Sequence, residues 1–315
     1  MVFRKIKLMS MRVTAPILMV GLIFWNSLPG NSQSCFSCKS APDSTIFCDD
    51  FESDESLTNR YFGYDDDGGE FICIKNIGRD GTAGMQVKWQ KGEVAAGGLQ
   101  KSIGRSPDPH MTKTAFPERH FHEIYWRIDI KLEKNWEGGG GDKLSRATTI
   151  ATKNWQQGMI AHIWSAGAPD NDYLLMDPAS GISEEGKLVS TKYNDFEKLR
   201  WLGNKRGDHP LFSKENIGKW NCIVAHVKLN TPGKSDGIFE FWINDLPQAA
   251  RYDLNWHADW NTNSESYAIN AIFFENYWNQ GAPKEQARYF DNILISTAPI
   301  QCNCAIQEKK ETKKE

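Results

Sequence analysis

The chain has no hydrophobic run long enough to cross a membrane as a helix. Its apolar stretch from Ala15 to Trp25 contains 11 residues, whereas a membrane-spanning helix needs about 20. The chain also has no large excess of charge, because 37 Lys and Arg against 40 Asp and Glu leave a net charge of -3. We therefore predict no membrane span and no general attraction to nucleic acid.

Three common catalytic motifs are absent as well. The sequence contains no Gly-x-Ser-x-Gly nucleophile elbow, no Gly-x-x-x-x-Gly-Lys phosphate loop and no His-Glu-x-x-His metal motif. Each of these motifs holds reactive groups at a fixed spacing, so its absence argues against the corresponding enzyme class.

The first 34 residues have the order of a secretory signal. Basic residues precede the apolar stretch, and the small polar segment Ser32-Gln33-Ser34 follows it. We predict a signal peptide over residues 1–34 with cleavage before Cys35, and hence a secreted or periplasmic protein. A cysteine directly after the cleavage site leaves lipid anchoring as an alternative.

The remaining sequence is long enough for one large core. We predict a single domain over residues 35–304, followed by a charged tail over residues 305–315 that is disordered because it has too little apolar surface to bury. Oligomeric state has no signal in the composition.

Seven cysteines lie in the predicted exported part, at positions 35, 38, 48, 73, 222, 302 and 304. In an oxidising compartment disulfides are their expected fate, and an odd number leaves at least one unpaired. The pairs Cys35-x-x-Cys38 and Cys302-x-Cys304 leave a four-thiolate zinc site as the alternative, although the second spacing is tighter than usual for zinc ligands.

The strongest local pattern is a strand from Glu123 to Leu132. Apolar residues from Ile124 to Leu132 alternate with polar ones that include Tyr125, Arg127 and Asp129. Such a period of two predicts a strand with one face in a core.

Further strands are predicted along the chain from the same alternation or from β-rich composition, at residues 159–164, 222–229, 237–243, 269–274 and 288–295. The segments 222–229 and 237–243 are separated by a turn-rich stretch, which predicts a hairpin. Only short stretches such as 194–199 suggest a helix. The fold class predicted from these segments is all-β, with two antiparallel sheets packed as a sandwich.

Twelve tryptophans raise the question of sugar binding. Trp126 and Trp242 lie in predicted strands and are expected in the core. Six others lie near Gly, Asn, Asp and Lys in apparent loops or strand ends, namely Trp136, Trp155, Trp201, Trp256, Trp260 and Trp278. Exposed aromatic faces stack well on sugar rings, but packing is the favoured interpretation for any single one.

Two kinds of polysaccharide cleavage make different demands on the residues. A retaining glycosidase needs two carboxyl groups about 5 Å apart, whereas Glu123 and Asp129 lie six positions apart on one strand, which is roughly 20 Å. β-Elimination needs a cation against the uronate carboxylate and a base for the α-proton. Arg127, Tyr125, Lys143, Arg146 and His162 supply residues of these types, so the lyase hypothesis is the stronger one.

Three segments resemble the concanavalin A-like lectin and glucanase superfamily, namely residues 48–52 (CDDFE), 239–245 (FEFWIND) and 288–296 (RYFDNILIS). The resemblance implies a jelly-roll sandwich in which the first and last strands are neighbours. With those strands adjacent, the resemblance permits Cys48 to approach Cys302, and it permits a structural calcium ion at Asp49, Asp50 or Asp291, although no motif in the sequence requires the ion.

Within this superfamily the chain resembles the family fourteen polysaccharide lyases, which cleave alginate or glucuronan-type polymers. Gly140-Gly141-Asp142-Lys143-Leu144, Ala161-His162-Ile163-Trp164 and Tyr173-Leu174-Leu175-Met176 carry this resemblance. It implies Lys143 and Tyr173 as catalytic residues. The chain departs from the family pattern at Asp142, at His162, which replaces an arginine, and at Leu175, which stands where a second tyrosine is expected.

The resulting hypothesis is an exported lyase that cleaves an acidic polysaccharide without a required cofactor. Tyr173 is its proton-transfer group, and Lys143, Arg127 and His162 neutralise the substrate carboxylate. Substrate binding is assigned to Tyr125, Asn276, Tyr277 and Trp278. A non-catalytic carbohydrate-binding module is the alternative, followed by a glycoside hydrolase.

Overall fold

The computed structural model describes residues 36–260 and 267–302. Almost all regular structure in this part is β-strand, and the single α-helix, α1 (Leu57–Arg60), has one turn. The predicted signal peptide, Cys35, Cys304 and the predicted tail lie outside the described residues. Within the two described ranges, no helix has both the length and the hydropathy needed to span a membrane.

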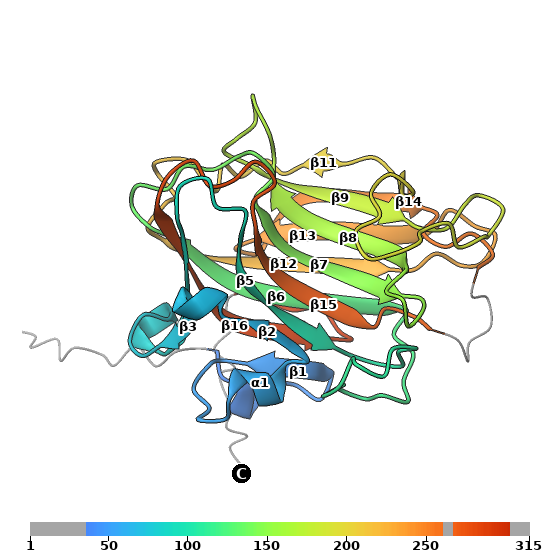
Figure 1. Ribbon diagram of the computed structural model, residues 1–315, viewed down its shortest axis with the longest axis horizontal. Helices are drawn as coiled ribbons and strands as arrows, with labels where there is room; N and C mark the ends of the chain where they lie inside the picture. The colour runs from blue at the N-terminus through green and yellow to red at the C-terminus, as the bar shows by residue number, and fades with distance from the viewer. Residues whose placement is uncertain (1–35, 261–266, 303–315) are drawn as a thin grey trace, which may run out of the picture. The chain divides into compact units, whose positions relative to one another are not determined.

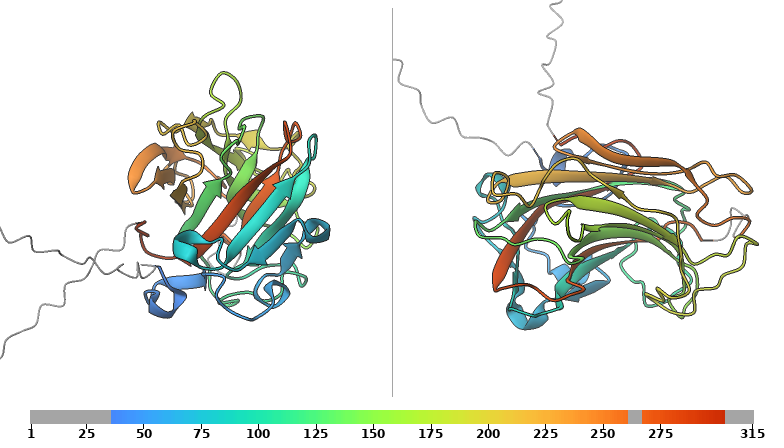
Figure 2. Two further views of the ribbon diagram at one scale, coloured as in Figure 1. Left: turned by 90° about the vertical axis from the view of Figure 1, so that its left-hand side faces the viewer. Right: turned by 90° about the horizontal axis from the view of Figure 1, so that it is seen from above.

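Two antiparallel sheets of eight strands each form two layers, as seen in Figures 1 and 2. The order of sheet A is β14 (Leu246–Leu254), β13 (Gly237–Ile243), β12 (Trp220–Lys228), β6 (Glu123–Leu132), β16 (Gln286–Ser296), β4 (Gly84–Trp89) and β3 (Phe71–Ile74), and β1 (Thr45–Asp49) also pairs with β16. The order of sheet B is β10 (Arg200–Trp201), β9 (Leu174–Ser180), β8 (Gln157–Ser165), β7 (Lys143–Ile150), β15 (Ala271–Tyr277), β5 (Ala95–Ser102) and β2 (Gly63–Asp65), and β11 (Lys205–Arg206) pairs with β9. The prediction of an all-β jelly-roll sandwich is confirmed.

The main core lies between the two sheets. Strand β6 has the predicted bounds, and its apolar residues from Ile124 to Leu132 all belong to this core. Trp126 links the layers, because its indole Nε1 donates a hydrogen bond of 3.0 Å to Ser145 Oγ on β7. Strands β12 and β13 pair antiparallel, so the predicted hairpin is confirmed.

The helix predicted over residues 194–199 is wrong. Those residues form turns, and Asn194 has a φ of 54°. A left-handed residue cannot continue a right-handed helix. The neighbouring Tyr193 and Phe196 instead pack against hydrophobic residues on the outer face of sheet B, the face turned away from sheet A.

Two disulfides correct the pairing implied by the resemblance. The first and last strands are neighbours as implied, since Cys48 lies opposite Leu294 in the β1–β16 pair. Cys48 is bonded to Cys38, however, and Cys302 is bonded to Cys222 on β12. The four-thiolate zinc alternative is therefore wrong, because two of its four ligands are held in disulfides. Cys73 is a free, exposed cysteine in the described part of the chain.

Candidate active site

Three basic side chains converge on the outer face of sheet B, where β7, β8 and β15 run side by side (Figure 1). They are Lys143 and Arg146 on β7 and His162 on β8, and we call them the basic cluster. Their exposed fractions are 2%, 0% and 1%. Glu275 on β15 completes the group, with its Oε1 3.0 Å from Arg146 Nη2.

An irregularity in β7 brings Lys143 to this face. Leu144 and Ala147 both belong to the core between the sheets, so strict alternation alone does not place Lys143 beside Arg146. The pairing of β7 with β8 shifts register between Lys143 and Ser145. The shift lets Lys143 Nζ reach the ring of Tyr277 at 4.3 Å, on the same side as Arg146.

Arg146 organises the cluster. Its Nη1 donates to Asn194 Oδ1 at 2.7 Å and lies 3.3 Å from His162 Nε2. A guanidinium group only donates, so His162 Nε2 accepts and the neutral imidazole carries its proton on Nδ1. The rings of Tyr193 and Phe273 lie 4.6 Å and 4.9 Å from Arg146 Cζ and fix the plane of the guanidinium group.

The cluster holds several buried polar atoms without a well-formed hydrogen bond: Arg146 Nε and Nη2, His162 Nδ1 and Glu275 Oε2. The ion pair between Arg146 and Glu275 is close but lacks the alignment of a hydrogen bond. Buried polar groups are ordinarily satisfied, so a group of unsatisfied ones in one place suits a site that binds a ligand.

Burial sets the protonation of the two titratable bases. Loss of water lowers the pKa of Lys143, which nearby Arg146 lowers further and Glu275 partly restores. Loss of water, together with Arg146 and Lys143, holds the pKa of His162 well below its usual 6.5, although the backbone of Asp177 opposes this. His162 is therefore neutral near pH 7, and Lys143 loses its proton at a lower pH than an ordinary lysine.

The structure brings together three of the predicted site residues, namely Lys143, His162 and Tyr277. Tyr277 is 40% exposed and lies at the edge of the cluster. Tyr173 lies just before β9, with Arg206 Cζ 4.0 Å from its ring, and none of its described contacts joins it to the cluster. Its role in proton transfer stays a prediction.

Arg127 is on the other sheet, which corrects its assignment to the substrate carboxylate. It lies on β6 of sheet A, 2% exposed, and donates twice to Asp129 at 2.9 Å and 2.8 Å. Tyr125, two residues earlier, stacks on His226 with ring centroids 4.0 Å apart. Both face away from sheet B, because strands β6 and β12 turn their polar residues outward.

Two predicted binding residues are buried in the interior, where one packs in the core and the other accepts a hydrogen bond. Trp278 is 1% exposed and stacks on Trp136, while Asn276 Oδ1 accepts a hydrogen bond from buried Arg288. Among the tryptophans considered for sugar stacking, Trp256 is also buried, whereas Trp201 is 40% exposed.

The residues proposed for calcium do not fit a shared ion. Asp50 Oδ2 accepts from the Cys38 backbone, and Asp291 Oδ2 accepts from the Arg79 backbone at 2.6 Å and from Thr82. Over the described ranges no group of three or more His, Cys, Asp or Glu side chains is arranged to hold a metal ion. We derive no role for calcium from these residues.

Glu275 and Asn194 are not among the site residues predicted from the sequence, and Arg146 is predicted there only as a residue of suitable type. The strand pattern could have pointed to Glu275, because it is two residues from Tyr277 and residues two apart share a strand face. No sequence pattern pointed to Asn194, because it reaches Arg146 from a loop 48 positions away.

Comparison with known proteins supports the fold. No protein-family model matches the chain, and no curated protein matches it. Among solved structures, a marine PL-14 alginate lyase from Aplysia kurodai superimposes with a TM-score of 0.54 at 13% identity, covering 81% of this chain and 99% of that one. An endo-β-1,4-glucuronan lyase from the fungus Trichoderma reesei gives 0.52 at 12% identity, covering 81% and 96%. The chain shares the jelly-roll fold of these lyases.

Proposed function

We propose that this protein is an exported polysaccharide lyase that cleaves a uronic-acid polymer by β-elimination on the outer face of sheet B. The observation that carries the proposal is the basic cluster, in which Lys143, Arg146 and His162 lie out of water beside one carboxylate, Glu275. Arg146 supplies the positive charge that the carboxylate of one sugar residue needs, and Lys143 supplies an amine beside it whose pKa is lowered. The shared fold of the alginate and glucuronan lyases adds support.

Each group in the site has a task in this reaction. Arg146 binds the uronate carboxylate and stabilises the negative charge that develops when the α-proton leaves. Lys143 Nζ takes that proton, because its lowered pKa increases the fraction of neutral amine. The electron pair forms the new carbon–carbon double bond, and the bond from the β-carbon to the leaving sugar oxygen breaks.

The leaving oxygen needs a proton, and we assign its delivery to Tyr277. Its ring lies 4.3 Å from Lys143 Nζ, and its exposure leaves it accessible to a polymer. His162 keeps the Nη1 side of Arg146 in place through its Nε2 atom.

The test mixes the purified protein with glucuronan, alginate and a neutral glucan and follows the ultraviolet absorbance of the unsaturated product. Lys143→Ala should lower the rate about 10²- to 10⁴-fold, the range for loss of an acid–base group. The control is Lys131→Ala, which removes a lysine that packs on Trp220 and Tyr289 and should keep the rate.

Three results would contradict the proposal. An unchanged rate in Lys143→Ala would remove the assigned base. Binding of a polymer without any product would favour the carbohydrate-binding module. New reducing ends without a double bond would show a hydrolase.

A further inference from the structure

One stretch of the chain covers the whole basic cluster. Residues 191–201, which we call the covering segment, place an aromatic ring against each member: Tyr193 4.6 Å from Arg146 Cζ, Phe196 5.2 Å from Lys143 Nζ, and Trp201 with its centroid 6.2 Å from that of His162. A polymer cannot reach the three basic groups while these rings lie over them.

Asn194 at the centre of the segment fills the position that a substrate oxygen needs. Its Oδ1 accepts from Arg146 Nη1 at 2.7 Å, and its backbone N–H donates to Gln157 Oε1 at 2.8 Å. The amide oxygen is thus held against the guanidinium group as one oxygen of a carboxylate would be, but without the negative charge.

The covering segment is held to the sheet through side chains. Between residues 191 and 199, every described backbone-to-backbone hydrogen bond stays within the segment. The backbone of Ser190 donates to Gly181 at one end, and strand β10 pairs with β9 at the other. Residues 191–199 are fixed at both ends and attached between them by side chains. They can therefore move away from the sheet without breaking the β10–β9 pair, while Trp201 on β10 stays in place.

We propose that residues 191–199 of the covering segment form a lid, and that a uronate opens it by displacing Asn194 from Arg146. The bond from Arg146 to the neutral amide has a charge on the donor alone, whereas a carboxylate adds the attraction of an ion pair at a site with little water. An anionic sugar therefore offsets the loss of the Asn194 contact, whereas a neutral sugar does not. The lid makes the site selective for acidic polymers, an inference that rests on the proposed function and adds a gate to it.

Substitutions at Asn194 test the lid in two directions. Asn194→Ala removes the competing oxygen and should lower the apparent Kd for a glucuronic-acid tetrasaccharide about tenfold, the value of one hydrogen bond to a charged group. Asn194→Asp supplies a carboxylate within the lid and should raise the apparent Kd for the same tetrasaccharide at least tenfold. Asn154→Asp is the control, since it adds the same charge at an exposed turn position.

A proteolysis assay measures opening of the lid and does not depend on lyase activity. Lys192 and Lys198 are exposed trypsin sites within the covering segment. Saturating glucuronic-acid tetrasaccharide should speed cleavage at these two lysines in the folded wild-type protein, and a neutral cellotetraose at the same concentration should not. Phe196→Ala, which loosens the lid without touching Asn194, should speed cleavage with no ligand present.

The outcomes separate the lid from the proposed function. Unchanged affinity in both Asn194 variants, or slower cleavage at Lys192 and Lys198 with the uronate, would overturn the lid while the double-bond assay could still succeed. If no unsaturated product forms but the uronate opens the lid, the lyase proposal fails and the gated uronate site stands. If Asn194→Ala does not fold, Asn194→Asp and the wild-type cleavage assay still decide.

Discussion

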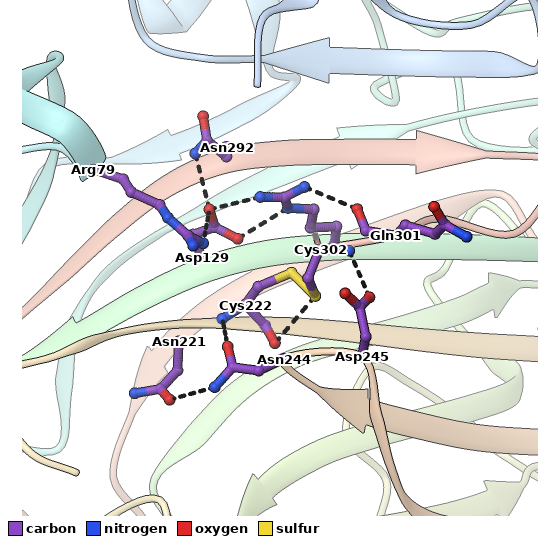
Figure 3. The surroundings of a disulfide bond; sticks show 10 residues. Arg79, Asp129, Asn221, Cys222, Asn244, Asp245, Asn292, Gln301 and Cys302 are labelled. Atoms are coloured by element: carbon purple, nitrogen blue, oxygen red, sulfur yellow. Dashed lines mark hydrogen bonds and ion pairs between the residues drawn. A yellow bond between two sulfur atoms is a disulfide. The ribbon is translucent and has the colours of Figure 1, made fainter. Parts of the chain in front are cut away.

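The two sheets each carry a buried arginine on the face turned away from the core, and the surroundings of the two differ sharply. Arg127 on sheet A donates to both oxygens of Asp129 and to the backbone carbonyl of Gln301. Asp129 also accepts from Arg79 and Asn292, as Figure 3 shows beside the disulfide between Cys222 and Cys302. Arg127 and Asp129, the two fully buried charges of this network, each have several partners.

Arg146 on sheet B has an ion pair without hydrogen-bond alignment, two nitrogens without a well-formed hydrogen bond, and a loop asparagine as its best partner. Its neighbours include two further bases whose pKa values are lowered by burial. A buried arginine whose donors all have partners stabilises a fold, whereas one with free donors among other bases is available for chemistry. The following predictions test that distinction.

The largest expected effect is on the disulfide beside the Arg127 network. Replacing Cys222 and Cys302 by serine opens a loop of 80 residues and should lower the free energy of unfolding by about 4.5 kcal/mol on the chain-entropy estimate. The same change at Cys38 and Cys48, which are 10 residues apart, should cost about 2.7 kcal/mol. Urea denaturation measures both, and a reversed order would show that strain or residual structure outweighs loop length.

Next in size is the contrast between the arginines themselves. Arg127→Met leaves buried Asp129 with fewer donors and should destabilise the protein by about 3–5 kcal/mol. Arg146→Met should cost less than about 2 kcal/mol, since Glu275 is 12% exposed and can be hydrated.

Activity should show the opposite order for the same two variants. Arg146→Met should lose about 10²- to 10³-fold in rate on an acidic polymer, and folded Arg127→Met should stay near wild type. Equal losses of activity in both variants, measured where both are folded, would remove the distinction between the two sites.

A smaller effect should appear in the pH dependence of stability. The folded protein holds the pKa of His162 well below 6.5, so the unfolded chain binds more protons as the pH falls through 6.5. Wild type should therefore lose about 1.4 kcal/mol relative to His162→Gln by about pH 5.5.

The difference between these two proteins is the quantity to measure, because Asp177 acts with the opposite sign. Burial raises the pKa of Asp177 from 3.8 to about 7, so the folded protein keeps a proton that the unfolded chain releases and its stability falls as the pH rises from about 3.8 to 7. The free energy of unfolding is measured for wild type and His162→Gln from pH 7.5 to about 5.5. If the two curves stay parallel over this range, His162 is not buried in its neutral form.

The smallest effect is expected at Tyr173. Tyr173→Phe keeps the ring beneath Arg206 and should change the rate less than about twofold, whereas Tyr277→Phe should lower it at least tenfold. Comparable losses in the two variants, each measured at saturating substrate, would return the proton-transfer role to Tyr173.

Much of the fold was predictable because the evidence for it is local. Alternation in β6 marked both its bounds and its core face, and the β12–β13 hairpin followed from two such runs around a turn. The candidate site was only partly predictable. Lys143, His162 and Tyr277 came from a resemblance and from residue type, while Glu275 and Asn194 needed the pairing of β15 with β7 and the path of a loop.

Local sequence pattern was enough to identify the main strands and the side chains that share a face on them, since a period of two is a property of a few neighbouring residues. Long-range packing sets the assignment of Arg127 and Arg146 to different sheets, the pairing of four of the cysteines, and the position of residues 191–201 over the basic cluster. These features depend on contacts between residues far apart in the chain. Such contacts follow from how the strands pair and pack across the two sheets, which no local pattern records.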